Sequence, residues 1–185
     1  MARTSSNMLP IGTLAPEFSL IDTITGKTIN LHQLKGENGT VIMFICNHCP
    51  FVIHLNSELV TIANTYVKKG ISFIAISSNN AENYPQDAPD KMKAHAKVKG
   101  YSFPYLYDES QEVAKAYDAA CTPDFYLFNR NLKLTYRGQL DDSRPENNMP
   151  ISGKDLRHAL DCLIDEKENN EIQKPSIGCG IKWKI

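Results

Sequence analysis

Long apolar runs are missing from this sequence. None of its hydrophobic stretches approaches the ~18 residues that a membrane-spanning helix needs. Residues 1–10 also lack the apolar centre that is typical of a secretory signal peptide. We therefore expect a cytoplasmic protein that does not enter a membrane.

An excess of charge is missing as well. The 20 Lys and Arg residues nearly balance the 21 Asp and Glu residues, which leaves a formal net charge of -1. Such a chain has no long-range attraction for phosphate backbones or anionic lipids, and no cluster of cations compensates for this. We expect neither nucleic acid nor a membrane surface as a partner.

The five cysteines are an odd number, which excludes a fully paired disulfide framework of the kind found in small secreted domains. A chain of 185 residues can bury enough apolar surface to fold without disulfides or a structural metal. We expect free thiols whose pairing, where it occurs, is transient.

Apolar periodicity predicts a layered α/β domain. Uninterrupted apolar runs at 40–45 and 71–76 are typical of strands that are buried on both faces. Apolar residues at steps of three and four predict a helix from Pro50 to Tyr66 between these strands. Further predicted elements are a hairpin at 16–31, a helix ending at 99, a short strand at 105–107, a helix at 110–117, a hairpin of strands 124–128 and 132–137, and a final helix after a capping box at 152–155.

These elements together predict a mixed central sheet flanked by helices, with an N-terminal β-hairpin. We place one domain at residues 11–166. Residues 1–10 are expected to be a flexible N-terminus, and residues 167–185 form a C-terminal tail extension that could pack near the active site.

The candidate site is the segment Cys46-Asn47-His48-Cys49-Pro50, where the first buried strand meets the helix. Proline prefers the first position of a helix, so Cys49 should be the N-cap residue. The free N–H groups and the dipole there favour a thiolate and lower a thiol pKa from about 8.5 to about 7. A protonated His48 nearby would lower it further. Cys49 is therefore the predicted nucleophile.

Two other interpretations of the motif stay open. Cys46 and Cys49 could simply be small buried apolar residues, which is a common role for free cysteine. Alternatively, Cys46, His48 and Cys49 could be soft metal ligands, with Cys179 as a fourth. A structural zinc site normally takes two well-separated ligand pairs, and the second pair is absent here. We therefore predict no metal and no cofactor.

Three segments carry a resemblance to a known superfamily. Residues 12–20 match the redoxin opening G-x-x-A-P-x-F-x-L, residues 121–125 match a cis-proline segment, and residues 175–183 match the tail of one subgroup. With the cysteine motif, the chain resembles the thioredoxin-like/redoxin superfamily (AhpC/TSA-related). It is most similar to bacterial peroxiredoxin-like "thioredoxin family proteins" with a CNHCP motif. The resemblance implies a thioredoxin-like fold.

The resemblance also implies roles for individual residues. The Thr122-Pro123 bond is expected to be cis and to face the active-site sulfur, where the loop holds an extended partner chain. His48, Pro50, Thr122 and Pro123 are thus candidate substrate-binding residues. In thioredoxins an aromatic residue lies 17 positions after the nucleophilic cysteine. Tyr66 lies 17 positions after Cys49, so the resemblance implies that Cys49 matches the nucleophile.

A resolving cysteine is not fixed by the resemblance. Val52 occupies the position where thioredoxins have it, so Cys46, one turn upstream, is the first candidate. Cys121, beside the cis-proline loop, and Cys179, in the tail, are the other candidates.

The leading functional hypothesis is a thiol-dependent oxidoreductase of antioxidant type. Cys49 would attack the sulfur of a protein disulfide or the oxygen of a peroxide, and a second cysteine would resolve the intermediate. An unidentified thiol would then act as reductant. The alternative is a thioredoxin-fold binding or redox-sensing module that does not turn over.

Overall fold

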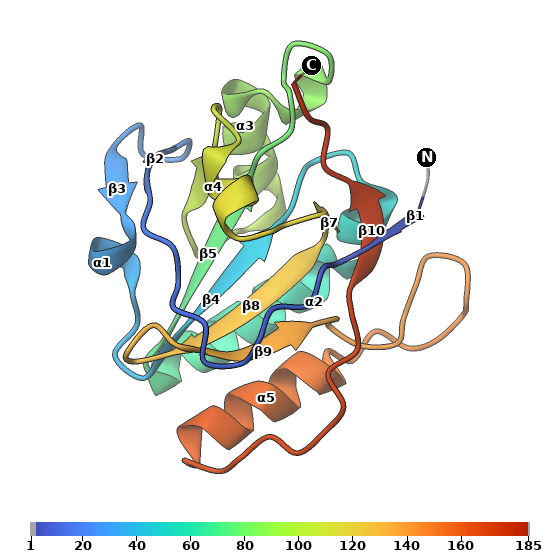
Figure 1. The fold of residues 1–185 in the computed structure, drawn as a ribbon. Coiled ribbons are helices and arrows are strands. Elements are labelled where there is room, and N and C mark those ends of the chain that lie inside the picture. The colour runs from blue at the N-terminus through green and yellow to red at the C-terminus, as the bar shows by residue number, and fades with distance from the viewer. Residues whose placement is uncertain (1–2, 185) are drawn as a thin grey trace.

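The computed structural model describes residues 3–184 (Figure 1). Its centre is a seven-stranded mixed sheet with the order β3-β2-β6-β5-β4-β8-β9. These strands are β2 (Ser19–Asp22), β3 (Thr28–Asn30), β4 (Gly39–Phe44), β5 (Ile71–Ser77), β6 (Tyr105–Tyr107), β8 (Asp124–Asn129) and β9 (Leu134–Gly138). The helices are α1 (Leu31–Leu34), α2 (Pro50–Tyr66), η1 (Val67–Lys69), η2 (Pro85–Asp87), α3 (Pro89–Lys99), α4 (Glu112–Ala116) and α5 (Lys154–Ile164).

The middle strand β4 is buried along its whole length, as its uninterrupted apolar run predicts. It pairs parallel with β5 and antiparallel with β8. Parallel pairing of β4 and β5 requires a crossover, and α2 and η1 provide it. The mixed α/β sheet that the sequence predicts is therefore confirmed.

Alternate side chains of β4 enter different cores. Val41 and Met43 belong to a core that also contains buried residues of α2, α3 and α5. Ile42 and Phe44 belong to a second core, on the other face, with buried residues of α1 and α4. Successive side chains of a strand point to opposite faces, so one short strand joins both layers. Its end is consequently a rigid place from which to present the cysteine motif.

A second, three-stranded sheet has the order β1-β10-β7. It joins β1 (Arg3–Ser5), β10 (Ile177–Gly180) and β7 (Cys121–Thr122). In Figure 1 the first and last strands of the chain, blue and red, lie side by side at one edge of the molecule. The sequence analysis expected residues 1–10 to be flexible, whereas residues 3–5 form a strand there. Three residues are too few to show a strand pattern, and the pairing joins opposite ends of the chain.

The start of α5 differs from the expected capping box at 152–155. The N-cap residue is Gly153, with a φ of 63°, and no side chain of that box caps the helix. Instead, the Asp141 carboxylate accepts hydrogen bonds from the N–H groups of Ser152 and Gly153 at 2.7 and 2.6 Å. The carboxylate thus holds the loop that leads into α5, while the Leu140 carbonyl oxygen accepts hydrogen bonds from the helix N–H groups of Asp155 and Leu156 at 3.1 and 3.3 Å.

Within residues 3–184, no helix combines the length and hydropathy needed to cross a membrane.

Candidate active site

The cysteine motif occupies the turn between β4 and α2. Cys49 is the N-cap residue of α2 and Pro50 is its first residue, which confirms the predicted helix start. Cys46 and Cys49 are both buried, at 1% and 0% exposure, while Pro50 is exposed. The two sulfur atoms therefore lie beneath the surface at one end of the central sheet.

The cis-proline loop contacts both cysteines. The Thr122-Pro123 peptide bond is cis, as the resemblance implies. The Thr122 carbonyl oxygen lies 3.1 Å from Cys49 Sγ and accepts a hydrogen bond from the thiol form. The Thr122 hydroxyl lies 3.4 Å from Cys46 Sγ. Thr122 thus joins the two sulfurs of the motif through different atoms.

The tail adds a third sulfur. In the small sheet, Cys179 of β10 is paired with Thr122 of β7. This register puts Cys179 Sγ 2.9 Å from Cys49 Sγ. A residue 130 positions away in the chain is therefore in direct contact with the predicted nucleophile.

The surroundings of Cys49 lower its pKa to about 5. The largest cause is a hydrogen bond from the Cys46 thiol, against which burial acts in the opposite direction, and the Cys179 thiol and the Val52 N–H lower the pKa further. The sequence analysis attributed a smaller drop to the helix end and to His48. In the structure the helix end contributes through the Val52 N–H of its first turn, and two neighbouring thiols contribute more, whereas the His48 ring pairs with Asp87.

The pKa values of the two donor thiols, Cys46 and Cys179, are raised and not lowered. The pKa of Cys46 rises well above its usual value, mainly because it donates to Cys49 and because it is buried. Burial and the hydrogen bond to Cys49 raise the pKa of Cys179 to about 12. At neutral pH the site therefore holds one thiolate and two thiols.

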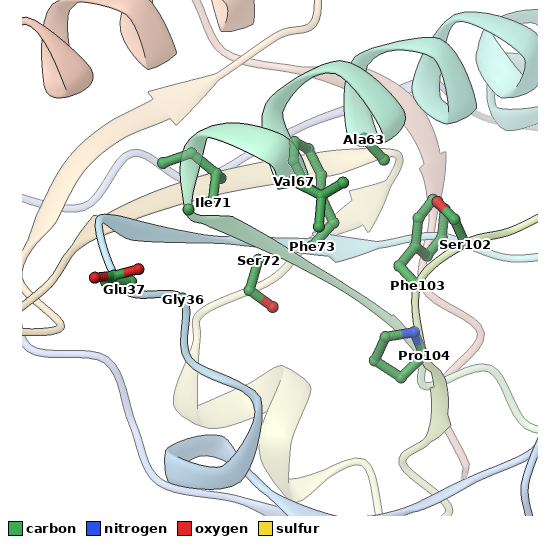
Figure 2. A pocket seen from close by; sticks show the side chains of 11 residues that line it. Gly36, Glu37, Ala63, Val67, Ile71, Ser72, Phe73, Ser102, Phe103 and Pro104 are labelled. Carbon is green, nitrogen blue, oxygen red and sulfur yellow. The ribbon is translucent and has the colours of Figure 1, made fainter.

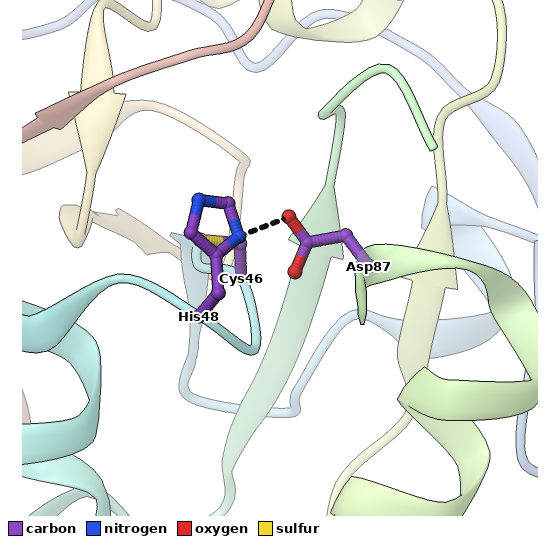
Figure 3. Close-up of side chains that lie close together, drawn as sticks. All are labelled: Cys46, His48 and Asp87. Atoms are coloured by element: carbon purple, nitrogen blue, oxygen red, sulfur yellow. Dashed lines mark hydrogen bonds and ion pairs between the residues drawn. The ribbon is translucent and has the colours of Figure 1, made fainter. Parts of the chain in front are cut away.

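Asp87 is a site residue that sequence reasoning missed. It is fully buried, and its Oδ2 lies 2.6 Å from Nδ1 of His48 (Figure 3). The same carboxylate accepts hydrogen bonds from the backbone N–H of Asn47 and the side chain of Asn79, both at 2.8 Å. The His48 ring also stacks on Tyr84, with 5.4 Å between ring centroids. Asp87 thus fixes the turn between the two cysteines.

Cys46, His48 and Asp87 also form a set of possible metal donors, since one ligand atom from each lies within 4.8 Å of the others (Figure 3). A thiolate, an imidazole and a carboxylate suit a soft or borderline divalent ion. Nε2 of His48 is buried without a hydrogen-bond partner among the described residues. Cys49 and Cys179, which the sequence-based zinc hypothesis included, contact each other instead.

The remaining cysteines are placed differently. Cys121 is buried, but its sulfur contacts the Pro123 carbonyl oxygen at 3.7 Å. Neighbouring residues of a strand point to opposite faces, so Cys121 faces away from the side on which Thr122 meets the cysteine motif. Burial raises the pKa of Cys121 above its usual value. Cys162, on α5, is half-buried and lies 3.5 Å from Nε2 of His158.

A cavity of about 240 Å³ lies elsewhere in the fold (Figure 2). It opens between Gly36, before β4, and Ser72 and Phe103. The motif cysteines follow the opposite end of β4, and six residues of strand span about 20 Å. The cavity is therefore not part of the thiol site.

The family of this chain follows from comparison with known proteins. The sequence profile of the Redoxin family matches residues 10–150. The chain belongs to the Redoxin family. Cys46, Cys49 and the cis-proline loop all lie within the matched segment.

Two solved structures are similar over nearly their full lengths. An uncharacterized conserved protein from Geobacillus kaustophilus is 60% identical, with 100% of this chain and 97% of that chain covered and a TM-score of 0.98. A hypothetical protein from Sinorhizobium meliloti 1021 is 44% identical, with 98% of each chain covered and a TM-score of 0.95. Comparison with curated proteins gave no match.

A more distant structure shows the fold. The thioredoxin domain of a thiol-disulfide oxidoreductase from Bacteroides vulgatus is 18% identical, with 70% of this chain and 89% of that chain covered and a TM-score of 0.59. This redoxin therefore has the thioredoxin-like fold that the sequence analysis predicted, and its family supports thiol oxidoreductase chemistry of a general kind.

Proposed function

We propose that this redoxin is a thiol-dependent oxidoreductase in which Cys49 is the nucleophile. The observation that carries the proposal is the position of Cys49, at the N-cap of α2, against the cis-proline loop and in contact with a second thiol. A pKa lowered to about 5 supplies a thiolate at neutral pH, and the thiolate is the reactive form.

The site favours small oxidants over extended protein disulfides. An extended substrate chain would need the edge of β7 beside Pro123, and β10 already pairs with that edge. A hydroperoxide or a low-molecular-weight disulfide needs only a path to the sulfur. Because Cys49 has no exposed surface, a small oxidant needs only a local opening of the site to reach the sulfur.

The reaction class has a direct test. Purified wild type and Cys49→Ser are mixed separately with hydrogen peroxide, a small aromatic disulfide and a disulfide-bonded protein, and loss of protein thiols is followed over time. We expect wild type to react with the two small oxidants faster than with the protein disulfide. We expect Cys49→Ser to lose the fast reaction with both, and a fast reaction retained in this variant would contradict the assignment.

The redox-sensing alternative is favoured by one observation, the complete burial of Cys49 beneath its neighbours. A sensor would react once and stop. With excess peroxide and a dithiol reductant, an enzyme consumes many equivalents of peroxide per protein chain, whereas a sensor consumes about as many equivalents as it has reactive cysteines. The stoichiometry therefore separates the two functions.

A further inference from the structure

The strand that carries Cys179 is bound along both of its edges. On one side Cys179 and Gly180 pair with β7, and on the other side residues 177–179 pair with β1. Beyond the strand, the N–H of Ile181 donates to the Ala120 carbonyl oxygen at 3.1 Å, and that of Lys182 donates to the Asn79 side chain at 2.8 Å. The position of the Cys179 sulfur is therefore fixed by the fold.

Gly178 allows this close approach. A Cβ at this position would lie 1.9 Å from the Thr122 carbonyl oxygen and 3.1 Å from the Pro123 ring. No side chain larger than hydrogen fits at such a distance without moving the backbone. Gly178 is thus the residue that lets β10 lie directly on the cis-proline loop.

We propose that Cys179 is the thiol that resolves oxidised Cys49, an inference that rests on the function proposed above. The two sulfurs are 2.9 Å apart, and a disulfide bond is about 2.05 Å long. Closing the bond therefore needs the two sulfurs to approach each other by about 0.9 Å. The resolving thiol comes from the C-terminal strand and not from the Cys-x-x-Cys motif.

The proposed reaction uses a hydroperoxide as oxidant and an external thiol as reductant. The Cys49 thiolate attacks a peroxide oxygen, the O–O bond breaks, and the alkoxide or hydroxide that leaves takes a proton. The Cys49 sulfenic acid that results is attacked by Cys179 sulfur. This step forms the S–S bond, breaks the S–O bond and releases water with the proton of the Cys179 thiol. An external thiol then returns both sulfurs to the reduced state by exchange.

Oxidation of Cys49 also prepares Cys179 for this step. In the reduced site the pKa of Cys179 is raised by burial and then by the hydrogen bond and charge of the Cys49 thiolate. The sulfenic acid is uncharged at the sulfur, so the causes that depend on the thiolate disappear when it forms. Lys182 lowers the pKa of Cys179.

Cys46 has a different role in this scheme. It donates a hydrogen bond to the Cys49 thiolate, and its sulfur also contacts the Thr122 hydroxyl at 3.4 Å. It lies in the turn that Asp87 fixes through the Asn47 N–H. Cys46 therefore stabilises the thiolate before oxidation and stays a thiol after it.

Peptide mapping after one equivalent of hydrogen peroxide tests the inference. Wild type is compared with Cys179→Ser and with the control Cys162→Ser, whose half-buried thiol lies on α5. We expect a Cys49–Cys179 disulfide in wild type and in the control. In Cys179→Ser we expect loss of that bond and accumulation of Cys49 sulfenic acid, trapped as its dimedone adduct. A wild-type disulfide that joins Cys49 to Cys46 or to Cys121 overturns the inference but leaves the oxidoreductase function standing.

If Cys49 instead stays reduced in wild type, the proposed function fails and the inference fails with it. The thiol count of the same sample distinguishes this outcome from a different pairing.

A pair of glycine variants tests the part played by β10 without removing a cysteine. In Gly178→Ala the new methyl group meets the Thr122 backbone, whereas in Gly180→Ala it lies 3.1 Å from the Thr4 hydroxyl, which can rotate away. We expect Gly178→Ala to lose most of the Cys49–Cys179 disulfide while Cys49 is still oxidised to sulfenic acid. Gly180→Ala should give the wild-type yield. Equal disulfide yields in both folded variants would contradict delivery of Cys179 by β10.

Discussion

At the scale of single residues, the lowered pKa of Cys49 depends on two neighbouring thiols more than on the helix that follows it. The Cys46 thiol is the largest cause of its lowered pKa, and the Cys179 thiol contributes in the same direction. Hydrogen bonds to a charged group are stronger than those between neutral groups. The cost of burying the Cys49 charge is thereby offset inside the protein.

Replacing the main donor should therefore raise the pKa of Cys49. In Cys46→Ala the sulfur of Cys49 loses its strongest hydrogen bond, and we expect its pKa to rise by at least one unit from about 5. The control is Cys121→Ala, which removes a buried thiol that contacts the Pro123 carbonyl oxygen. Titration of the ultraviolet thiolate absorbance measures both, and an unshifted midpoint in Cys46→Ala would show that Cys46 is not the donor.

Sequence reasoning reached Cys49 because its determinants are local. The apolar run of β4, the proline at the first position of α2 and the periodicity of that helix lie within one continuous segment. Asp87 and the contact of Cys179 depend on pairing across 39 and 130 positions. No local pattern encodes such distances, so Asp87 was missed and Cys179 stayed one candidate among three.

At the scale of elements, a buried ion pair holds β8 against β9. Arg137 and Asp124 are both fully buried, with 3.0 Å between Nη2 and Oδ2, and the guanidinium lies over the Tyr126 ring. Burial raises the pKa of Asp124 to about 7, and Arg137 counteracts part of that rise. Residues 137–144 thus begin with a structural charge and include the Asp141 carboxylate, which binds the loop that leads into α5.

Breaking this pair should cost much stability. Arg137→Met leaves the Asp124 carboxyl buried without its cation, and we expect a loss of about 3 to 5 kcal/mol in the free energy of unfolding. The matched control is Arg130→Met, which removes an exposed ion pair with Glu166 and should cost less than about 1 kcal/mol. Urea denaturation measures both, and similar small losses would mean that the buried pair is not a stabilising contact between these strands.

At the scale of the whole molecule, the thiolate links redox chemistry to folding stability. The pKa of Cys49 is about 5 in the folded protein and about 8.5 in an unfolded chain. Between these values the unfolded state binds more protons at Cys49 than the folded state, so the stability due to Cys49 increases with pH. Its contribution is fully present above about pH 8.5 and is lost as the pH falls to about 5.

The pH dependence of unfolding should therefore differ between wild type and Cys49→Ser. We expect the difference in free energy of unfolding between the two proteins to grow in favour of wild type from about pH 5 to about pH 8.5. Taking the difference removes the opposite effect of Asp124, whose raised pKa lowers stability as the pH rises toward about 7. A difference that does not change with pH would contradict the lowered pKa in the folded state.

The central claim is that Cys49 is a thiolate at neutral pH, and a thiolate titration tests it most directly. Ultraviolet absorbance is recorded against pH for reduced wild type and for Cys49→Ser, and the second curve is subtracted from the first. We predict a single difference transition with a midpoint near pH 5. A midpoint near the ordinary cysteine value of about 8.5 would contradict the account.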